Sequence, residues 1–483
     1  MRKLLDLSAQ RCIALMETLM LQEDWISTRE LAAKVSASER SVAEDLAWLR
    51  KNWGEELGME ISVKNGVRVQ HQSVAVMGQI FLKLFNDSLA LRWIKELFFH
   101  PQNKLEFYEA KLFVSRSTLL RLFPVINRFL GDFGMAVVRK DNLLEIQSND
   151  EQFLRQFFTG FLIEISDPDP SAYALPLEPS LLKSLLQDLF TTHLSKTESS
   201  FVMEDDIAVF YYLVFTMISL IRETQGYGVP SEYPIDDALL HRSLSSLKEA
   251  FPHLSTKQLQ PIYEFMIRQY IGWDSEEEKT NVFAAITDFW SVLAPMIPSG
   301  LDERRKERLL FLLQSIYFTA KYRPHRTSML FDRIGYFADS LKKTHRSLWD
   351  LVETQTQTMA QRLGVDIPSQ LHSILFWLCL QVPEILDHNP NRKAILVSDF
   401  GIQHSCFLAK MLEDQFHQGH APRLTITVYP LSEVLQSGLP TGYDLLLTTI
   451  PQLIPLHPHG ILLNDYPNPE NLFLLDRKMR ELP

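Results

Sequence analysis

The chain has 483 residues, 46% of them hydrophobic and 22% charged, and a formal net charge of −11 at pH 7. This composition excludes a disordered chain, and the length is sufficient for several domains. No apolar run reaches eighteen residues and the N-terminus lacks a signal-peptide pattern, so we expect a cytoplasmic protein without a membrane span. Three widely separated cysteines fit a reducing compartment, and no metal or cofactor is expected.

The charge is distributed unevenly along the chain. Residues 1–150 carry 20 Lys and Arg against 19 Asp and Glu, whereas the remainder carries 28 against 40. The acidic character therefore lies outside the first 150 residues. Because these residues are only neutral overall, any nucleic-acid binding by them must rely on local clusters of arginine and must weaken steeply with salt.

The first predicted elements are a short helix that begins near Ser27, a tight turn and a second helix that Ser38 can cap. The second helix has an apolar stripe at spacings of four, three and four, which indicates an amphipathic helix that faces a core. Its members are Val42, Leu46, Leu49 and Trp53. Arg40, Ser41 and Glu44 are expected on the opposite, exposed face.

A β-hairpin is predicted next, in the segment MEISVKNGVRVQ. The alternation around Asn65-Gly66 indicates a type I′ turn, which needs positive φ at both central residues. Lys64 and Arg68 flank this hairpin and are candidates for contacts with phosphate groups.

The same pattern occurs a second time at an offset of 76 residues. Arg40-Ser41 falls on Arg116-Ser117, and Gly58-Met59 falls on Gly134-Met135. The second hairpin, MAVVRKDNLLEIQ, has Asp141-Asn142 at its turn. Each copy therefore predicts a winged helix-turn-helix, a unit whose commonest use is to place its second helix in the major groove of DNA.

The second copy has one irregularity. Pro124 lies inside its second helix, where proline removes a hydrogen bond and kinks the chain. We expect this helix either to bend there or to begin later than the pattern indicates.

The expected DNA-contacting residues come from both copies. They are Arg40, Ser41, Lys64, Arg68, Arg116, Ser117, Arg121, Arg128 and Lys140. The recognition helix of the first unit also carries Glu44 and Asp45, whose negative charge opposes DNA. We therefore expect the second unit to dominate, so that Arg121→Ala weakens DNA binding more than Arg40→Ala.

The segment from about residue 151 to 390 predicts successive helices, without strand signals of comparable strength. It divides into two blocks of about 110 residues, which contain the similar segments IAVFYYLVFTMISLIRETQ and LLFLLQSIYFTAKYRPHR. No nucleophile–base pair, phosphate-binding loop or metal set is recognisable, so an enzyme is not expected. Duplicated helical blocks are typical of a regulatory module.

The periodicity changes at Arg392. Strands are expected in KAILVSD, LTITVY, YDLLLTTI and GILLND, alternating with helices in CFLAKMLEDQF, LSEVLQSG and PENLFLLDRKMREL. Such alternation predicts a small parallel α/β sheet. The fold class is therefore mainly α and multidomain, with one small α/β domain at the C-terminus.

This order of elements resembles the Mga/AtxA family of transcription regulators of Gram-positive pathogens, which act in virulence. The resemblance implies five domains: winged helix-turn-helix units at 1–70 and 71–160, PTS-regulation-domain (PRD)-like helical blocks at 161–275 and 276–390, and an EIIB-like domain at 391–483. It implies a global transcription regulator that binds double-stranded DNA, with activation favoured over repression. It also implies a homodimer or higher oligomer through the EIIB-like domain, and phosphorylation of histidines by a phosphocarrier of the sugar phosphotransferase system.

The chain departs from the family pattern at two kinds of position. Active EIIB proteins carry a phosphocysteine followed by five residues and Thr-Ser, whereas here His404-Ser405 matches Thr-Ser and Ser398 stands at the cysteine position. We interpret this block as a former phosphotransfer domain retained for dimerisation. The usual regulatory histidine is also missing seven residues before Arg222, so His193 and His372 are the phosphorylation candidates.

Three alternatives remain from the sequence. A phosphotransferase enzyme is disfavoured by the missing cysteine, and an RNA-binding antiterminator by the helical N-terminus. A scaffold that uses its winged units for protein contacts is excluded least well, because these units are not basic overall.

Overall fold

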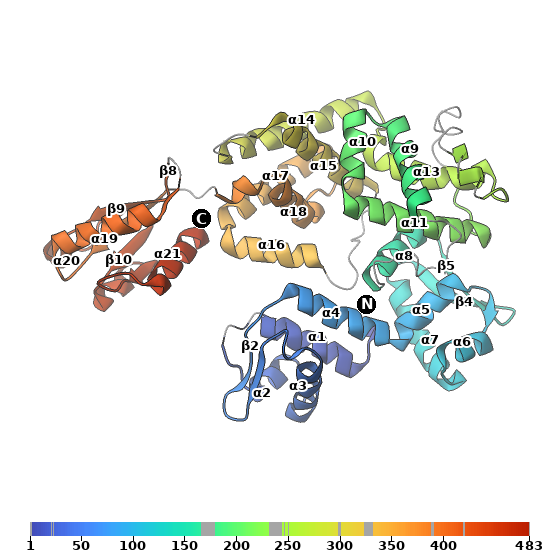
Figure 1. Cartoon of the computed structure of the whole chain (residues 1–483), viewed down its shortest axis with the longest axis horizontal. Coiled ribbons are helices and arrows are strands. Elements are labelled where there is room, and N and C mark those ends of the chain that lie inside the picture. Colours follow the sequence, from blue (N-terminus) through green and yellow to red (C-terminus); the bar gives the residue numbers. More distant parts are fainter. Residues whose placement is uncertain are drawn as a thin grey trace. The chain divides into compact units, whose positions relative to one another are not determined.

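The computed structural model describes residues 2–20, 22, 24–165, 179–230, 244–245, 247–249, 251–297, 301–322, 332–387, 391–418 and 421–482. Contacts divide the chain into two compact units, residues 1–271 with 325–333 and residues 272–324 with 334–483. Both units are mainly helical, with short hairpins near the N-terminus and one parallel sheet near the C-terminus (Figure 1).

The first winged unit consists of three helices and a hairpin. Its elements are η1 (Arg2–Leu4), α1 (Leu7–Met20), α2 (Thr28–Lys34), α3 (Glu39–Trp53), β1 (Met59–Ser62) and β2 (Gly66–Val69). Ser27 caps α2 and the expected apolar stripe of α3 is buried at Val42, Leu46 and Leu49. The helix-turn-helix and the wing were thus correctly predicted as elements.

The β1–β2 hairpin differs from its prediction at the turn. Ser62 pairs with Gly66, which leaves a loop of residues 63–65, and of the expected central pair only Gly66 has a positive φ, of 95°. The cause is a neighbour distant in sequence, because Ile26 and Val67 form a β-bridge beside the turn. A Cβ at position 66 would collide with the carbonyl oxygen of Ile26. The type I′ prediction at Asn65-Gly66 was therefore wrong.

In the second winged unit, a longer helical segment precedes the helix-turn-helix. Its elements are α4 (Val74–Asp87), α5 (Leu89–Phe99), β3 (Asn103–Lys104), α6 (Leu105–Leu112), α7 (Arg116–Gly131), β4 (Met135–Lys140), β5 (Leu143–Ser148) and α8 (Glu151–Ile165). Helix α7 is a single α-helix that contains Pro124, so it does not begin later than the pattern indicated. Asp141 and Asn142 have φ values of 50° and 65°, which confirms the predicted turn of this hairpin.

The first helical block follows in the same unit. Its described helices are α9 (Pro179–His193), α10 (Lys196–Met203), α11 (Asp206–Thr224) and α13 (Thr256–Ile271). Among the described residues, α11 is the one helix that could cross a membrane by length and composition, and the bent pair α4–α5 could do so if it formed one span. However, 61% of the apolar window of α11 is buried inside the protein.

The second helical block has a hydrophobic core of its own. Its helices are α14 (Glu276–Leu293), η3 (Ala294–Met296), α15 (Glu303–Tyr322), α16 (Arg333–Thr344), α17 (Arg346–Leu363), η4 (Pro368–Gln370), α18 (Leu371–Gln381) and η5 (Pro383–Asp387). Phe289, Phe318, Trp349 and Leu375 are among its buried members. Within the described parts of residues 151–387 there is no strand, in line with the sequence.

The C-terminal block is a four-stranded parallel sheet in the order β11-β10-β6-β9, as the alternating pattern predicted. Its elements are β6 (Arg392–Val397), α19 (Ile402–Gln415), β7 (His417–Gln418), β8 (Ala421–Pro422), β9 (Leu424–Val428), α20 (Leu431–Ser437), β10 (Leu445–Thr448), η6 (Pro451–Leu456), β11 (Gly460–Leu462) and α21 (Pro469–Glu481). Two separate apolar clusters pack against the sheet.

Candidate nucleic-acid interface

The two recognition helices, α3 and α7, begin in the same way. Ser38 caps α3 and Ser115 caps α7, each by accepting a hydrogen bond from the backbone N–H three residues later. The turn before each helix contains a residue in the left-handed region, Ser36 in the first unit and Phe113 in the second. Both pairs are separated by 77 residues (115 − 38 and 113 − 36).

The wings keep the offset of 76, because the left-handed Gly58 and Gly134 precede the first strand of each hairpin. The second copy is therefore one residue shorter between helix and wing. The structural equivalent of Arg40 is Ser117, and the predicted match of Arg40-Ser41 with Arg116-Ser117 was wrong by one residue. A single constant offset could not reveal this deletion.

The exposed face of α3 is nearly neutral. The Arg40 side chain is 89% exposed, but its Nε donates to Oε1 of Glu44 at 3.0 Å. Ser41 is half-buried and its hydroxyl lies 2.9 Å from that of Ser38. To contact DNA, Arg40 must first give up its hydrogen bond to the Glu44 carboxylate. This loss reduces the net free energy that Arg40 contributes to DNA binding.

Asp45 is buried beneath this face and does not extend toward solvent. Its carboxylate accepts hydrogen bonds from the Ser8 hydroxyl at 2.7 Å and from Arg11 Nε at 2.5 Å, and the residue is 4% exposed. The expectation that Asp45 opposes DNA was wrong, because its charge is neutralised by α1 within the core of the unit.

The exposed face of α7 is more cationic. Nη1 of Arg116 pairs with Oε1 of Glu106 at 2.6 Å, and the Ser117 hydroxyl lies 2.9 Å from that of Ser115. Arg121 and Arg128 are exposed, and no carboxylate of the described residues lies within ion-pair distance of either. These two guanidinium groups are available to an external anion.

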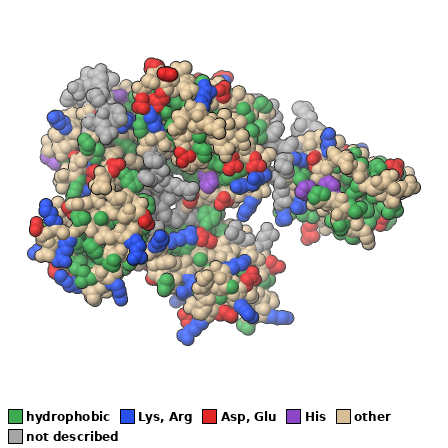
Figure 2. Space-filling view, turned by 180° about the vertical axis from the view of Figure 1, so that it is seen from behind, with side chains coloured by type: hydrophobic (Ala, Val, Ile, Leu, Met, Phe, Trp, Pro, Cys, Tyr) green, Lys and Arg blue, Asp and Glu red, His purple; other side chains and the backbone are tan. Residues whose placement is uncertain are grey.

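The wings contribute unequally to the candidate surface. Lys64 and Lys140 are exposed near the tips of the two hairpins. Arg68 is half-buried instead, since its Nη2 pairs with Glu60 at 2.9 Å and its guanidinium lies 5.2 Å from the ring centroid of Trp25. Figure 2 shows Lys and Arg side chains distributed over the winged units.

A buried ion cluster joins the second winged unit to the first helical block. Arg155 of α8 and Arg222 of α11 are both fully buried. Arg155 Nη2 pairs with Glu223 at 2.7 Å, while Arg222 binds both oxygens of Glu151 at 2.7 Å. Charges buried in this way are stable only as a connected set, so the cluster fixes α8 and α11 together.

Tyr227 extends this contact to the wing. Its ring stacks 3.6 Å from the Arg222 guanidinium, and its hydroxyl donates to Glu145 of β5 at 2.5 Å. Burial acts to raise the pKa of Glu145, but hydrogen bonds from Tyr227, Gln147 and Gln102 outweigh this effect and lower it. This contact was not predicted from the sequence, although Glu151 and Arg155 lie one helical turn apart in the largely apolar helix α8.

The two histidine candidates lie in different surroundings. His193, at the end of α9, is half-buried, its buried Nε2 has no hydrogen-bond partner among the described residues, and burial lowers its pKa. His372, on α18, is also half-buried, and its ring centroid lies 5.7 Å from that of Trp349. Nε2 of His193 can accept a phosphoryl group only after a local opening of the block.

Ser398 lies directly after β6, at the position where the expected resemblance to EIIB proteins implied a cysteine. It is 2% exposed, its hydroxyl lies 2.7 Å from Nδ1 of His404, and it accepts from the backbone N–H of Phe400. His404 Nε2 lies 2.8 Å from the carbonyl oxygen of Asp465. The buried serine therefore links residues of the loop after β6 through its contacts with His404 and the backbone of Phe400.

Exposed aromatic side chains surround this loop. Phe400, Phe407 and Tyr466 are 70%, 50% and 69% exposed, and the rings of Phe400 and Phe407 both contact His404. Apolar surface is visible on this block in Figure 2. Cys406 directly precedes Phe407 in the sequence and is also exposed, whereas Cys12 and Cys379 are buried.

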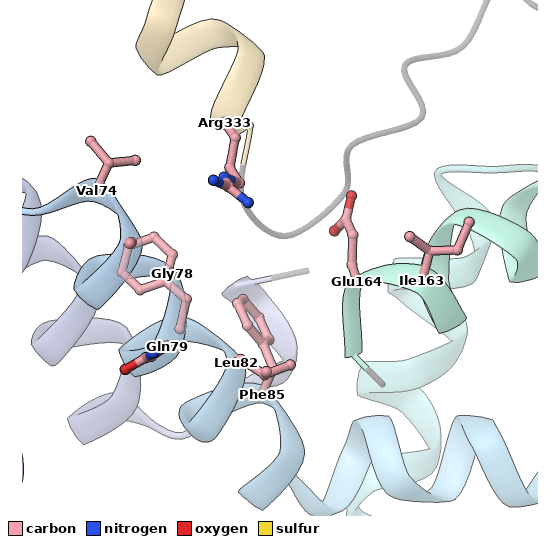
Figure 3. Close-up of a pocket in the computed structure, with 10 residues that line it drawn as sticks. Val74, Gly78, Gln79, Leu82, Phe85, Ile163, Glu164 and Arg333 are labelled. Carbon is pink, nitrogen blue, oxygen red and sulfur yellow. The ribbon is translucent and has the colours of Figure 1, made fainter. Parts of the chain in front are cut away.

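A cavity of about 500 Å³ lies in the first unit, between α4 and the end of α8 (Figure 3). Phe81, Leu82 and Phe85 supply apolar walls, while Glu164 and Arg333 add charged groups. No residue of α3 or α7 is among its lining residues, and the cavity was not indicated by the sequence.

Comparisons with known proteins agree with this organisation. The Mga helix-turn-helix domain matches residues 75–162, which cover the second winged unit except for its first residue and its last three. A protein described as a trans-acting regulator from Streptococcus pneumoniae serotype 4 is 21% identical over 442 residues, covering 85% of this chain and 86% of that protein. The capsule synthesis positive regulator AcpB of Bacillus anthracis is 21% identical over 220 residues, which cover 46% of this chain and 43% of AcpB.

These matches confirm the resemblance to regulators of the Mga/AtxA type. The names are those of transcription regulators and not of enzymes. Together with the helix-turn-helix domain, they support a role for this chain in transcription regulation.

Proposed function

We propose that this chain is a cytoplasmic, DNA-binding transcription activator whose second winged unit makes the stronger contact with duplex DNA. The observation that carries the proposal is the exposed face of α7, where Arg121 and Arg128 have no ion pair among the described residues. This face lies inside the region that matches the helix-turn-helix domain. On α3, by contrast, Arg40 is already held by Glu44.

A salt titration of DNA binding tests this proposal. Arg121→Ala and Arg40→Ala make the same chemical change on the two recognition helices. A lost phosphate contact lowers the slope of log K against log salt by about 0.9. We expect Arg121→Ala to show a loss of that size and Arg40→Ala a smaller one, because the Arg40–Glu44 pair must first be broken.

Two outcomes would contradict this proposal in different ways. Equal or reversed losses would refute the dominance of the second unit. Absence of DNA binding at low salt, by folded protein, would favour a scaffold whose winged units contact other proteins.

The proposal includes control by phosphorylation of the helical blocks, for which His193 and His372 are the candidates. Burial lowers the pKa of His193 and so keeps its imidazole in the neutral form, which phosphoryl transfer requires, until the block opens. Incubation with the phosphorylated phosphocarrier protein of the phosphotransferase system, followed by mass spectrometry under basic conditions, tests this part. If the double variant His193→Ala/His372→Ala takes up as much phosphoryl label as the wild-type protein, both candidates are excluded.

The proposal also includes self-association, with the EIIB-like C-terminal block in the interface. Support comes from the exposed aromatic residues Phe400, Phe407 and Tyr466. Cross-linking with a short bis-maleimide tests it, because burial raises the pKa of Cys12 and Cys379 to about 12 and leaves exposed Cys406 to react. A dimer band that is lost in Cys406→Ser supports this interface, and a band that persists in that variant contradicts it.

A further inference from the structure

The exposed face of the second recognition helix is not uniformly polar. Its exposed residues between the first turn and the last are Arg116, Ser117, Leu120, Arg121, Pro124 and Arg128. Two apolar side chains therefore lie in the middle of a row of arginines. Leu120 is 50% exposed, which places about half of a large apolar side chain in water on the face that the arginines would turn toward DNA.

The first recognition helix has apolar residues at the same two places. With the structural offset of 77, Leu120 corresponds to Ala43 and Pro124 to Ala47, and both alanines are exposed. The two units differ in their charged residues but share this apolar centre. Only the second unit has a side chain there that extends well beyond the helix backbone.

We propose that Leu120 recognises the C5-methyl group of thymine in the major groove, so that the chain reads part of its site directly. The inference rests on the DNA binding proposed above. The thymine methyl is the apolar feature of base edges in that groove, and apolar side chains are its usual contacts. Leu120 gains free energy when its exposed part leaves water against such a group.

The charge of the face favours DNA over an apolar protein partner as the occupant. The segment from Arg116 to Arg128 contains three arginines and no acidic residue. Arg121 and Arg128 carry no ion pair among the described residues, so they remain available to the phosphates that flank the groove. Phosphate contacts fix the position of the helix, and the apolar centre then faces the base edges.

The expected effect follows from the size of one methyl group. Burial of one methylene-sized group is worth about 0.8 kcal/mol, which corresponds to a roughly fourfold change in affinity. A helix that contacts two methyl groups would therefore distinguish methylated from unmethylated duplex by about one order of magnitude.

Two synthetic polymers isolate the contribution of the thymine methyl group to binding. Alternating dA-dT and alternating dA-dU duplexes present thymine or uracil in every register, and their base edges differ by the methyl group. We expect the wild-type protein to bind the dA-dT duplex at least about fourfold more tightly. Leu120→Ala should lower this ratio toward one with little loss of helix stability, because the side chain is half exposed and Ala has the highest helix propensity.

A matched control removes the same atoms elsewhere. Leu380 on α18 is 51% exposed, so Leu380→Ala makes an equivalent change outside the winged units and should leave the ratio at the wild-type value. Melting curves of both variants verify that the chain remains folded.

The outcomes separate this inference from the DNA-binding proposal. Equal binding of both polymers by the wild-type protein overturns methyl recognition and leaves DNA binding intact. A ratio that Leu120→Ala does not change also overturns it, because the preference would then arise from duplex shape. Failure to bind either polymer at low salt overturns both proposals.

Discussion

The buried ion cluster predicts a large and local loss of stability when one of its charges is removed. Arg155→Met replaces the guanidinium by an apolar side chain of similar length. Glu223, whose side chain is 1% exposed, then keeps a buried carboxylate without the partner that now lies 2.7 Å away. Removing one member of a buried pair typically costs about 3–5 kcal/mol.

The double variant Arg155→Met/Glu223→Met tests the cause of that loss. It removes the orphaned carboxylate, while Glu151 keeps its two bonds to Arg222. We expect most of the lost stability to return, since uncharged pairs of similar volume are often as stable as buried ion pairs. A coupling free energy of about 3 kcal/mol between Arg155 and Glu223 corresponds to a change of roughly two orders of magnitude in the equilibrium constant for local opening.

Hydrogen exchange measured by mass spectrometry on peptides from α8 and α11 is the suitable assay, because the full chain need not unfold in two states. Lys83→Met is the control: it breaks the exposed Lys83–Asp87 pair on α4 and should change exchange little. Equal effects of Arg155→Met and Lys83→Met would refute the reasoning, and so would a double variant no more protected than the single one.

Three further predictions concern single positions. Gly66→Ala should destabilise the first unit by roughly 2–4 kcal/mol in thermal unfolding, whereas Gly134→Ala, with positive φ but open space around it, should cost only about 1 kcal/mol; similar losses would contradict the role of the Ile26 backbone. Phe113→Gly relieves a left-handed conformation at a side chain that is 91% exposed, so the melting temperature should rise by an amount equivalent to about 1 kcal/mol; a fall would show that Phe113 contributes to the fold. Burial lowers the pKa of His193, so the unfolded chain takes up this proton first and stability falls as pH drops below about 6.5. Between pH 7.5 and 5.5, the melting temperature of His193→Leu should therefore decrease less than that of the wild-type protein. An equal or greater decrease would contradict the role of His193 in this pH dependence.

Local signals in the sequence were sufficient for most elements. Serine caps, amphipathic stripes and the Asp141-Asn142 turn depend on neighbouring residues alone, so both winged units could be predicted from them. The parallel sheet was predictable for the same reason, because continuous apolar runs alternated with helical periodicity.

Features set by distant neighbours could not be predicted. Asp45 is neutralised by Arg11, and the turn at Gly66 is set by the backbone of Ile26. Pairing of Arg155 with Glu223 brings together residues 68 positions apart. The one-residue deletion between α7 and its wing was hidden because the wings kept the offset of 76. The three contacts depend on partners that local periodicity does not specify, and the deletion depends on a change of offset within the second copy.

The contact between α11 and the second wing has a thermodynamic consequence for signalling. Arg222 and Tyr227 connect one helical block to both α8 and β5 through ion pairs, ring stacking and hydrogen bonds. Because coupling free energy is reciprocal, any modification of the block that changes DNA affinity tenfold must itself be favoured or opposed tenfold by bound DNA. Through this contact the promoter would act as an effector of its own regulator.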